Sequence, residues 1–437
     1  MAELQARWHQ ATAEIAESRW QELLQACGAA DLPFYSWRWL TQLEASGSIV
    51  PAQGWQPCHL SLWRGERLLA VAPLYLKGHS YAEFVFDQAF AQLAGQLGLR
   101  YHPKLVGMSP VSPVQGYRFF LDPGEDGAAL TALMVSLIDD FCARNGILSW
   151  NLLYVDPTWR PLAEAAGCAV WLNQQSCWTN PGHADFEDYL AGFNANQRRN
   201  IRRERKAVAD AGYVVEALAG DAIPAALLER MHDLYSLHCS RWGPWGSKYL
   251  TEAFFTAAAR DLRQHLVLFC AHRGELERPQ AMSLCVRGGE ALWGRYWGSE
   301  VEQDNLHFEV CYYAPIAWAI AQGIRRFDPG AGGSHKRRRG FLAEPRASLH
   351  RWSQTRFDAI VRDWLPGANQ QMLGEIDAIN AELPFRAAYD PLHAPGREQP
   401  TSTAAAAEAG VAEPGSAELG GSGGKGGDCP GGQGGDG

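Results

Sequence analysis

Apolar side chains recur at helical spacing in some segments and alternate with polar ones in others, which predicts a mixture of helices and strands. In the first 180 residues we expect helices over Glu14–Ala26, Phe90–Leu97, Gly127–Ala143 and Arg160–Ala166. Strands are expected over His59–Trp63, Leu68–Leu76, Arg118–Leu121, Leu148–Val155 and Cys168–Trp178. The first two of these strands flank the turn RGER and should form a hairpin.

A second cycle of elements begins after residue 180. We expect helices over Asp185–Phe193, Asn196–Ala211, Ile223–Arg241, Thr251–Leu262, His307–Gln322 and Thr355–Glu382. Strands are expected over Tyr213–Leu218, His265–His272, Gln280–Arg287, Ala291–Trp297, Arg325–Asp328 and Ala347–Ser353. This order predicts an α/β (α+β) protein whose two halves, 1–180 and 181–395, have mixed, partly antiparallel sheets.

The last forty residues differ in composition from the rest of the chain. From about Gly396 the sequence is rich in Gly, Ala and Ser, with almost no large apolar side chain. Such a segment cannot bury enough surface to offset the entropy lost on ordering, so we predict a disordered tail over 396–437.

Composition and charge narrow the class of protein. A net charge of −9 argues against a surface that binds nucleic acid throughout, but it permits local basic patches. The ten cysteines form no CxxC pair and lie among apolar neighbours, which favours small buried residues in a reducing compartment. The N-terminal residues lack an apolar run, and no stretch has the roughly 20 apolar residues of a membrane span, so we expect a soluble, cytoplasmic protein.

The strongest chemical signal is the basic helix expected over Asn196–Ala211. Six basic side chains fall in two adjacent rows on it: Arg198, Arg202 and Arg205, and Arg199, Arg203 and Lys206. Like charges this close repel, and an anion would relieve the cost; the planar guanidinium suits phosphate because it donates two hydrogen bonds at once. The alternative is an ordinary solvated basic face, with Ile201 and Val208 packed on the opposite side.

Two further segments could line a cleft. The glycine-rich stretch Gly330–Phe341 carries His335, Lys336 and three arginines, and its backbone N–H groups could converge on an anion; otherwise it is an exposed loop. The strand ending at Arg295, Tyr296 and Trp297 precedes a helix that opens with His307 and Glu309.

His307 and Glu309 are candidate proton acceptors for an amine nucleophile. The alternative is that His307 packs the helix start and Glu309 complements the helix dipole. Several other chemistries have no signal: GxSxG, HExxH, a P-loop and GxGxxG after a strand are all absent, and no metal site is expected.

These segments, in this order, resemble the FemAB-like proteins of the GNAT acyltransferase superfamily. The resemblance is carried by NQRRNIRRERKAVADAG, GRYWG, LHFEVCYYAPIAWAIAQG and GSHKRRRGF, and in the first half by PFYSWRWLTQLEASGSI, GWQPCHLSLW and APLYLKGHSYAEFVFD. It covers roughly residues 30–355. It implies two fused GNAT-like domains, and it matches Arg198, Arg199, Arg202 and Arg203 by position to the basic helix of bacterial Fem enzymes.

The resemblance also implies a reaction. Fem enzymes move amino acids from aminoacyl-tRNA onto peptidoglycan precursors, and other GNAT members use acyl-CoA. We therefore expect N-acyl or aminoacyl transfer to an amine acceptor, with acyl-CoA or aminoacyl-tRNA as co-substrate and no tightly bound cofactor. His307 or Glu309 would be the base, and the phosphate-bearing donor would meet Arg198, Arg199, Arg202, Arg203, Lys206, Arg295, Tyr296, His335 and Lys336. The rival hypothesis is a non-catalytic RNA-binding or cell-envelope interaction protein on the same fold.

Overall fold

The computed structural model describes residues 3–241, 248–387 and 389. They belong to one compact unit that spans Met1–Gly396. The tail predicted to be disordered, 396–437, lies outside the described residues. Within the described part of the chain, no helix is both long and apolar enough to cross a membrane.

A small antiparallel sheet belongs entirely to the first half. Its strand order is β1–β3–β4–β7, with bounds Leu4–His9 (β1), His59–Arg64 (β3), Arg67–Ala72 (β4) and Phe120–Leu121 (β7). The predicted hairpin is confirmed as β3 and β4, which pair antiparallel. The Trp8 ring of β1 stacks on Phe141 of helix α4 (Gly127–Arg144), with ring centroids 4.2 Å apart, so this helix packs against the edge strand β1.

A second, eleven-stranded sheet takes strands from both halves. Its order is β10–β11–β12–β13–β14–β9–β15–β8–β6–β5–β2. The bounds of its strands are Val214–Ala219 (β10), Leu266–His272 (β11), Ala281–Gly288 (β12), Ala291–Ser299 (β13), Arg326–Asp328 (β14), Ala169–Thr179 (β9), Leu342–Trp352 (β15), Ser149–Leu152 (β8), Lys104–Gly107 (β6), Tyr75–Lys77 (β5) and Trp55–Pro57 (β2). Most neighbours are antiparallel, but β13–β14 and β6–β8 are parallel, so the predicted mixed α/β class is confirmed.

Strand β9 joins the two halves. It precedes the expected boundary at residue 180, yet it pairs with β14 on one edge and with β15 on the other, and both of those strands come late in the chain. Hydrogen bonding therefore runs through this strand from one half of the chain to the other. The division into domains 1–180 and 181–395 stays a prediction.

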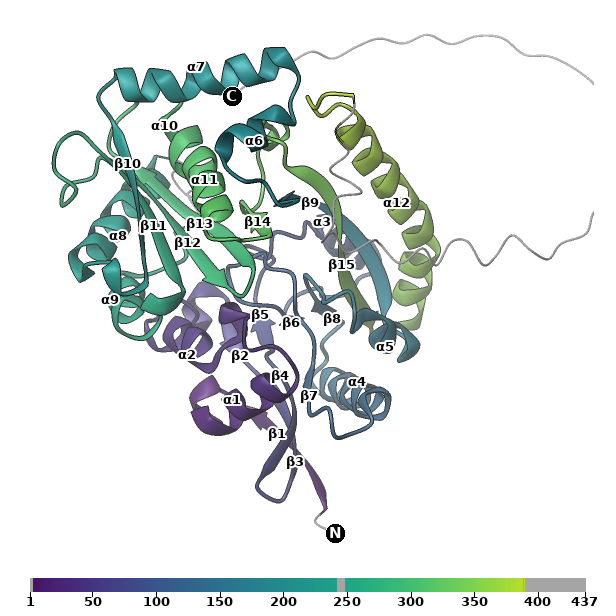
Figure 1. Cartoon of the computed structure of the whole chain (residues 1–437). Helices are drawn as coiled ribbons and strands as arrows, with labels where there is room; N and C mark the ends of the chain where they lie inside the picture. Colours follow the sequence, from purple (N-terminus) through teal and green to yellow (C-terminus); the bar gives the residue numbers. More distant parts are fainter. Residues whose placement is uncertain (1–2, 242–247, 388, 390–437) are drawn as a thin grey trace, which may run out of the picture. The chain divides into compact units, whose positions relative to one another are not determined.

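Helices flank the large sheet (Figure 1). Helix α8 packs on β13, α12 packs on β9 and β15, and α7 lies along the upper side of the view. The helix bounds are Glu17–Ala26 (α1), Trp37–Ala45 (α2), Gln88–Gln96 (α3), Arg160–Ala165 (α5), Phe186–Ala191 (α6), Ala195–Asp210 (α7), Ala225–Ser240 (α8), Glu252–Asp261 (α9), Leu306–Phe308 (α10), Ala314–Ala321 (α11) and Thr355–Ala381 (α12).

Most predicted elements occur within a few residues of their expected bounds. The basic helix is confirmed as α7, where Ile201 and Val208 are buried as expected. The helix expected at 307–322 contains a π-helical turn at Glu309–Tyr313 (η7) between α10 and α11, a feature often found at functional sites. Strand β15 starts five residues before its prediction, because Pro345 and neighbouring charged residues mask its pattern.

Among the α-helices and strands, four were not predicted: β1, α2, β2 and β6. The single strand predicted over Leu68–Leu76 is divided between β4 of the small sheet and β5 of the large one. Strand β6 begins with Lys104, a fully buried lysine, and a charged residue at the start of a four-residue strand removes the apolar signal. Several tryptophans, among them Trp20, Trp39 and Trp150, are fully buried, so core packing accounts for part of the high tryptophan content.

Candidate active site

Strands β13 and β14 run parallel for three residue pairs and then separate. The last pair is Trp293 with Asp328, where β14 ends. Strand β13 continues to Ser299, paired with β12 on its other edge. From Gly294 onward, the β14-facing edge of β13 has no strand partner within the described residues. An unpaired strand edge of this kind can hydrogen-bond an extended ligand.

Arg295 is the first predicted site residue on this open edge. Its side chain is only 2% exposed, and its Nη2 lies 3.1 Å from Asp328 Oδ2. Nη1 donates to the Gly294 carbonyl, whereas the buried Nε has no hydrogen-bond partner. A buried guanidinium with one free donor is a position where an acceptor atom of a ligand would be stabilised.

Asp328 collects donors from three segments. Besides Arg295, it accepts from the Gly330 N–H at 2.8 Å and from Gln175 Nε2 of β9 at 3.2 Å. The first half also contributes Phe34, whose ring lies 5.4 Å from the Arg295 guanidinium. The open edge of β13 is therefore framed by residues from both halves of the chain.

Tyr296 and Lys336 complete the buried part of the site. Tyr296 is buried and its ring lies 5.2 Å from that of Tyr235 on α8. Lys336 is 2% exposed and its Nζ donates to the Gly330 carbonyl. Burial lowers the pKa of Lys336 to about 8, against the opposing effect of Asp328. The glycine-rich segment thus brings a lysine into the interior.

His307 and His335 lie on the other side of Lys336. The half-buried His307 ring is 5.1 Å from Trp297 and 5.4 Å from Tyr312. Burial lowers the pKa of His307 to about 4, and the Arg339 charge adds to the effect, so the imidazole is neutral at pH 7. His335 is exposed, with its ring 5.3 Å from Phe308.

Glu309 faces α7. It lies on the π-helical turn, is buried, and accepts two hydrogen bonds from Arg205, from Nε at 3.0 Å and Nη2 at 2.9 Å. Arg205 also stacks over the Phe186 ring at 4.3 Å. This geometry anchors α7 to the site helix, and a catalytic role for Glu309 or His307 stays a prediction.

A second anchor joins Glu204, which the sequence did not single out, to Arg339 of the glycine-rich stretch. Glu204 accepts from Arg339 Nη2 at 2.7 Å and from the Tyr313 hydroxyl. Arg339 is 1% exposed and lies 3.5 Å over the Phe308 ring. We call Glu204, Arg205, Glu309 and Arg339 the α7 cluster. Arg205 and Glu309 were named from the sequence but could not be paired there, because the partners in this cluster are more than 100 residues apart.

The remaining basic residues of α7 point away from this cluster. Arg198 donates to the Phe193 carbonyl, and Arg203 lies 3.3 Å from Asn200 Oδ1. Arg202 pairs with Glu187, and Lys206 pairs with Asp210 at 2.6 Å. Arg199 is exposed, with no hydrogen bond or ion pair to any described residue.

Apart from Glu309, which is held by Arg205 in the α7 cluster, the structure separates the predicted site residues into two groups. Arg295, Tyr296, His307, His335 and Lys336 gather around the open edge of β13. The α7 residues Arg198, Arg199, Arg202, Arg203 and Lys206 make no contact with that group and form a surface.

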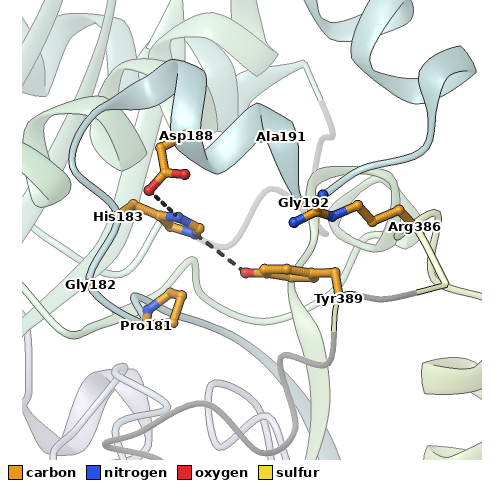
Figure 2. Close-up of a pocket in the computed structure, with 8 residues that line it drawn as sticks. All are labelled: Pro181, Gly182, His183, Asp188, Ala191, Gly192, Arg386 and Tyr389. Carbon is orange, nitrogen blue, oxygen red and sulfur yellow. Dashed lines mark hydrogen bonds and ion pairs between the residues drawn. The ribbon is translucent and has the colours of Figure 1, made fainter.

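A small pocket lies beyond α6, apart from both groups. It encloses about 210 Å³ and is lined by Pro181, Gly182, His183, Asp188, Ala191, Gly192, Arg386 and Tyr389. Figure 2 shows His183 between Asp188 and Tyr389: Nδ1 lies 3.4 Å from Asp188 Oδ2 and Nε2 lies 3.3 Å from the Tyr389 hydroxyl. Burial lowers the pKa of His183, and Asp188 acts against this shift.

Comparison with known families gives a match over most of the chain. A family model described as peptidoglycan biosynthesis/recognition matches residues 11–387. That range includes every residue discussed above except Tyr389 and the residues of β1. No curated protein matches this chain.

Several solved structures show distant similarity. FemX is 12% identical, with 82% of this chain and 100% of FemX covered and a TM-score of 0.48. The C-terminal domain of a putative lysylphosphatidylglycerol synthetase from Agrobacterium fabrum is 8% identical, with 82% and 97% covered and a TM-score of 0.47. A tandem GNAT protein from the clavulanic acid biosynthesis pathway is 12% identical, with 80% and 99% covered and a TM-score of 0.43.

Proposed function

The chain belongs to the FemAB-like family, and from that premise we propose that it transfers an acyl or aminoacyl group from an activated donor to an amine. The reaction would take place at the open edge of β13. The donor would be acyl-CoA or aminoacyl-tRNA, both of which carry phosphate groups.

One observation carries this proposal: β13 continues past the end of β14 and leaves a free strand edge beside buried positive charge. An extended, amide-bearing arm of a donor could pair with this edge as an added strand. Its activated carbonyl would then lie near the free Nε of Arg295, which could stabilise the charge that develops on the carbonyl oxygen.

Basic residues near the open edge suit a donor with phosphate groups. Lys336 and His335 lie on the segment that follows β14, and Lys336 is tied to Gly330. The exposed α7 residues, led by Arg199 and Arg203, could bind more distant phosphates such as those of a tRNA. In this arrangement the surface of α7 supplies affinity, and the chemistry occurs at β13.

Side-by-side assays would test the proposal. The full-length protein would be incubated with acetyl-CoA, longer acyl-CoAs or charged tRNA together with a mixture of primary amines, and amide products would be detected by mass spectrometry. We expect transfer from one donor class, with saturation in that donor. Arg295→Lys should reduce the rate by roughly 100-fold, because a single lost oxyanion donor costs about that much.

Arg325→Lys is the matched control. Arg325 lies just before β14 and its exposed side chain pairs with Glu290, so the activity should be unchanged. Failure of every donor would contradict the proposal. If the protein instead bound many RNAs with an affinity that fell steeply with salt, the non-catalytic RNA-binding hypothesis would be favoured.

A further inference from the structure

Four charged side chains are buried together in the first half of the protein. They are Lys77 at the end of β5, Glu83 and Asp87 in the segment that follows, and Lys104 at the start of β6; none is more than 2% exposed. We call these four residues the buried charge cluster. Lys77, Glu83 and Asp87 lie in APLYLKGHSYAEFVFD, one of the segments that carry the family resemblance, but the sequence assigned no role to any of the four.

The cluster is only partly satisfied by its own members. Lys104 Nζ lies 2.6 Å from Glu83 Oε2 and also bonds Asp87 Oδ2. The second oxygens of both carboxylates, Glu83 Oε1 and Asp87 Oδ1, have no hydrogen-bond partner although they are buried. Lys77 contacts neither carboxylate; its Nζ donates to the Tyr81 carbonyl and lies 3.6 Å over the Trp55 ring.

Stability alone does not explain this arrangement. Apolar residues of similar volume often stabilise a protein as well as a buried ion pair does, and an unpaired buried carboxylate oxygen is destabilising. Buried, incompletely bonded charges therefore point to a function.

The backbone around Glu83 is strained. Ala82 and Phe84, on either side of it, have φ angles of 66° and 58°, which side chains other than glycine rarely adopt. Tyr154, whose hydroxyl donates to the Glu83 carbonyl at 3.1 Å, has a φ of 56°. Three left-handed residues thus converge on one glutamate, and such strain persists where the surrounding structure holds a functional geometry.

Tyr154 links segment 78–87 to the open edge of β13. Burial raises the pKa of the Tyr154 phenol, and the charges that act on it include Asp328, Arg295 and Glu83. Tyr154 therefore bonds the backbone of Glu83 and lies within electrostatic range of the Arg295–Asp328 pair. The Phe84 ring contacts Tyr249 at 6.1 Å, which brings the same segment against the second half of the chain.

Two exposed rings mark the outer face of this segment. Phe86 is 74% exposed and Tyr81 is 64% exposed, more than any other large hydrophobic residue described. Aromatic side chains offer a large contact area for a ligand or a partner when they are exposed. The segment 78–87 thus has a buried carboxylate on one side and open aromatic surface on the other.

We propose that segment 78–87 forms the acceptor site, where Glu83 binds the attacking primary amine and takes its proton. This inference rests on the proposed function. The amine nitrogen forms a bond to the carbonyl carbon of the donor, and the bond from that carbon to the donor's sulfur or oxygen breaks. The proton lost by nitrogen passes to Glu83 Oε1, and the leaving sulfur or oxygen takes a proton from solvent.

The ionisation of Glu83 fits the role. Burial raises its pKa to about 7, although Lys104 and Lys77 lower it and Asp87 raises it. A base with a pKa near the working pH is the most effective for proton transfer. His307, with a pKa of about 4, is a weaker proton acceptor, and Glu309 is held by Arg205.

The first test measures amine binding without any donor. Nα-acetyl-L-lysine would be titrated into the full-length protein by calorimetry at pH 8, with Nα,Nε-diacetyl-L-lysine, which lacks the basic amine, as the control ligand. We expect the isosteric Glu83→Gln variant to weaken binding by roughly tenfold or more, because a charge-assisted hydrogen bond is lost. Glu125→Gln, which removes a carboxylate paired with Arg64 elsewhere in the first half, should bind as the wild type does.

The second test compares transfer with donor breakdown. Glu83→Gln should lose amide formation yet keep the slow hydrolysis of the donor, whereas His307→Asn and Glu309→Gln should retain the pH dependence that Glu83 imposes near pH 7. Equal amine affinity in wild type and Glu83→Gln, or no amine binding by the wild type, would overturn the proposal. Amine binding through Glu83 without transfer from any donor would instead contradict the proposed function and leave the acceptor site standing.

The Phe86→Ser variant provides a second test of the proposal in case Glu83→Gln does not fold. The Phe86 ring is mostly exposed, so its removal should leave the near-ultraviolet circular dichroism and the melting temperature unchanged. We expect a fall of several-fold in amine affinity, and an unchanged affinity would count against segment 78–87 as the acceptor site.

Discussion

The α7 cluster and the buried charge cluster each contain four charged side chains, but they differ in how completely their carboxylates are hydrogen-bonded. In the α7 cluster, Glu309 is fully engaged by Arg205, and Glu204 is shared by Arg339 and Tyr313. In the buried charge cluster, one lysine serves two carboxylates, Glu83 keeps a free oxygen, and the backbone is strained.

This difference separates two uses of charge. Complete pairing fixes one element against another, as the α7 cluster fixes the basic helix to the π-helical turn. Incomplete pairing leaves binding capacity that the fold itself does not use. The arginines of α7, which give the strongest signal in the sequence, are either completely paired or lie on the surface. Glu83, which gives no such signal, is incompletely paired.

The largest expected effect comes from removing the lysine shared by two carboxylates. Lys104→Met leaves Glu83 and Asp87 buried side by side, and we expect the free energy of unfolding to fall by about 3–5 kcal/mol. Urea denaturation followed by circular dichroism would measure it. Lys206→Met, which breaks the exposed pair with Asp210, should change stability by less than about 0.5 kcal/mol. Equal urea midpoints for the two variants would show that the buried lysine contributes no more to stability than the exposed one.

An intermediate effect concerns acid stability near the buried charge cluster. His350 on β15 is 1% exposed, with Nδ1 2.7 Å from Asn151 Oδ1 and Nε2 2.8 Å from the Ser348 hydroxyl. Burial lowers its pKa to about 3, with Asp87 raising it and Lys104 lowering it further. The unfolded chain therefore binds more protons than the folded one between pH 6.5 and pH 3, and stability falls as the pH drops through that window.

For His350 alone, this linkage amounts to about 2 kcal/mol between pH 8 and pH 5. The His350→Gln variant should lose less stability over that range than the wild type, as measured by urea midpoints at both pH values. A variant whose stability depends on pH as steeply as the wild type would show that the histidine is already charged in the folded protein.

The smallest effect on stability is expected at the surface of α7. Replacing Arg199 and Arg203 together with Ser should change the free energy of unfolding by less than about 0.5 kcal/mol, because neither pairs with an acidic residue. If this face binds a phosphate chain, the plot of log affinity for bulk tRNA against log salt should become shallower by about 1.5. Arg100→Ser with Arg356→Ser is the matched control, because both arginines are exposed and neither pairs with an acidic residue among those described.

Local patterns predicted much of the fold. The spacing of Ile201 and Val208, together with Gly212 after the last turn, located α7 within one residue, and the RGER turn located the hairpin. The gathering of Arg295, His307 and Lys336 near one strand edge follows from their places next to strand ends, which a sequence can indicate.

Long-range pairing lies beyond such patterns. Nothing near Arg205 identifies Glu309 as its partner, because the two are 104 residues apart and meet only through the tertiary fold. Lys104 was missed for a related reason: a lysine is expected to be exposed unless its counter-charges are known, and these come from a separate, irregular segment. The residues proposed for the acceptor site therefore lie in a segment where the local hydrophobic pattern predicts neither a helix nor a strand.

Strand β15 has a consequence for how the protein is made. It lies between β9 and β8, with Ser348 paired to Trp171, 177 residues earlier in the chain. During synthesis the edges of β8 and β9 that pair with β15 remain unpaired until the ribosome has released residue 352. Closure of so long a loop is slow, and open edges invite association with other chains in the meantime. We therefore expect the nascent protein to depend on chaperones until this last strand enters the sheet.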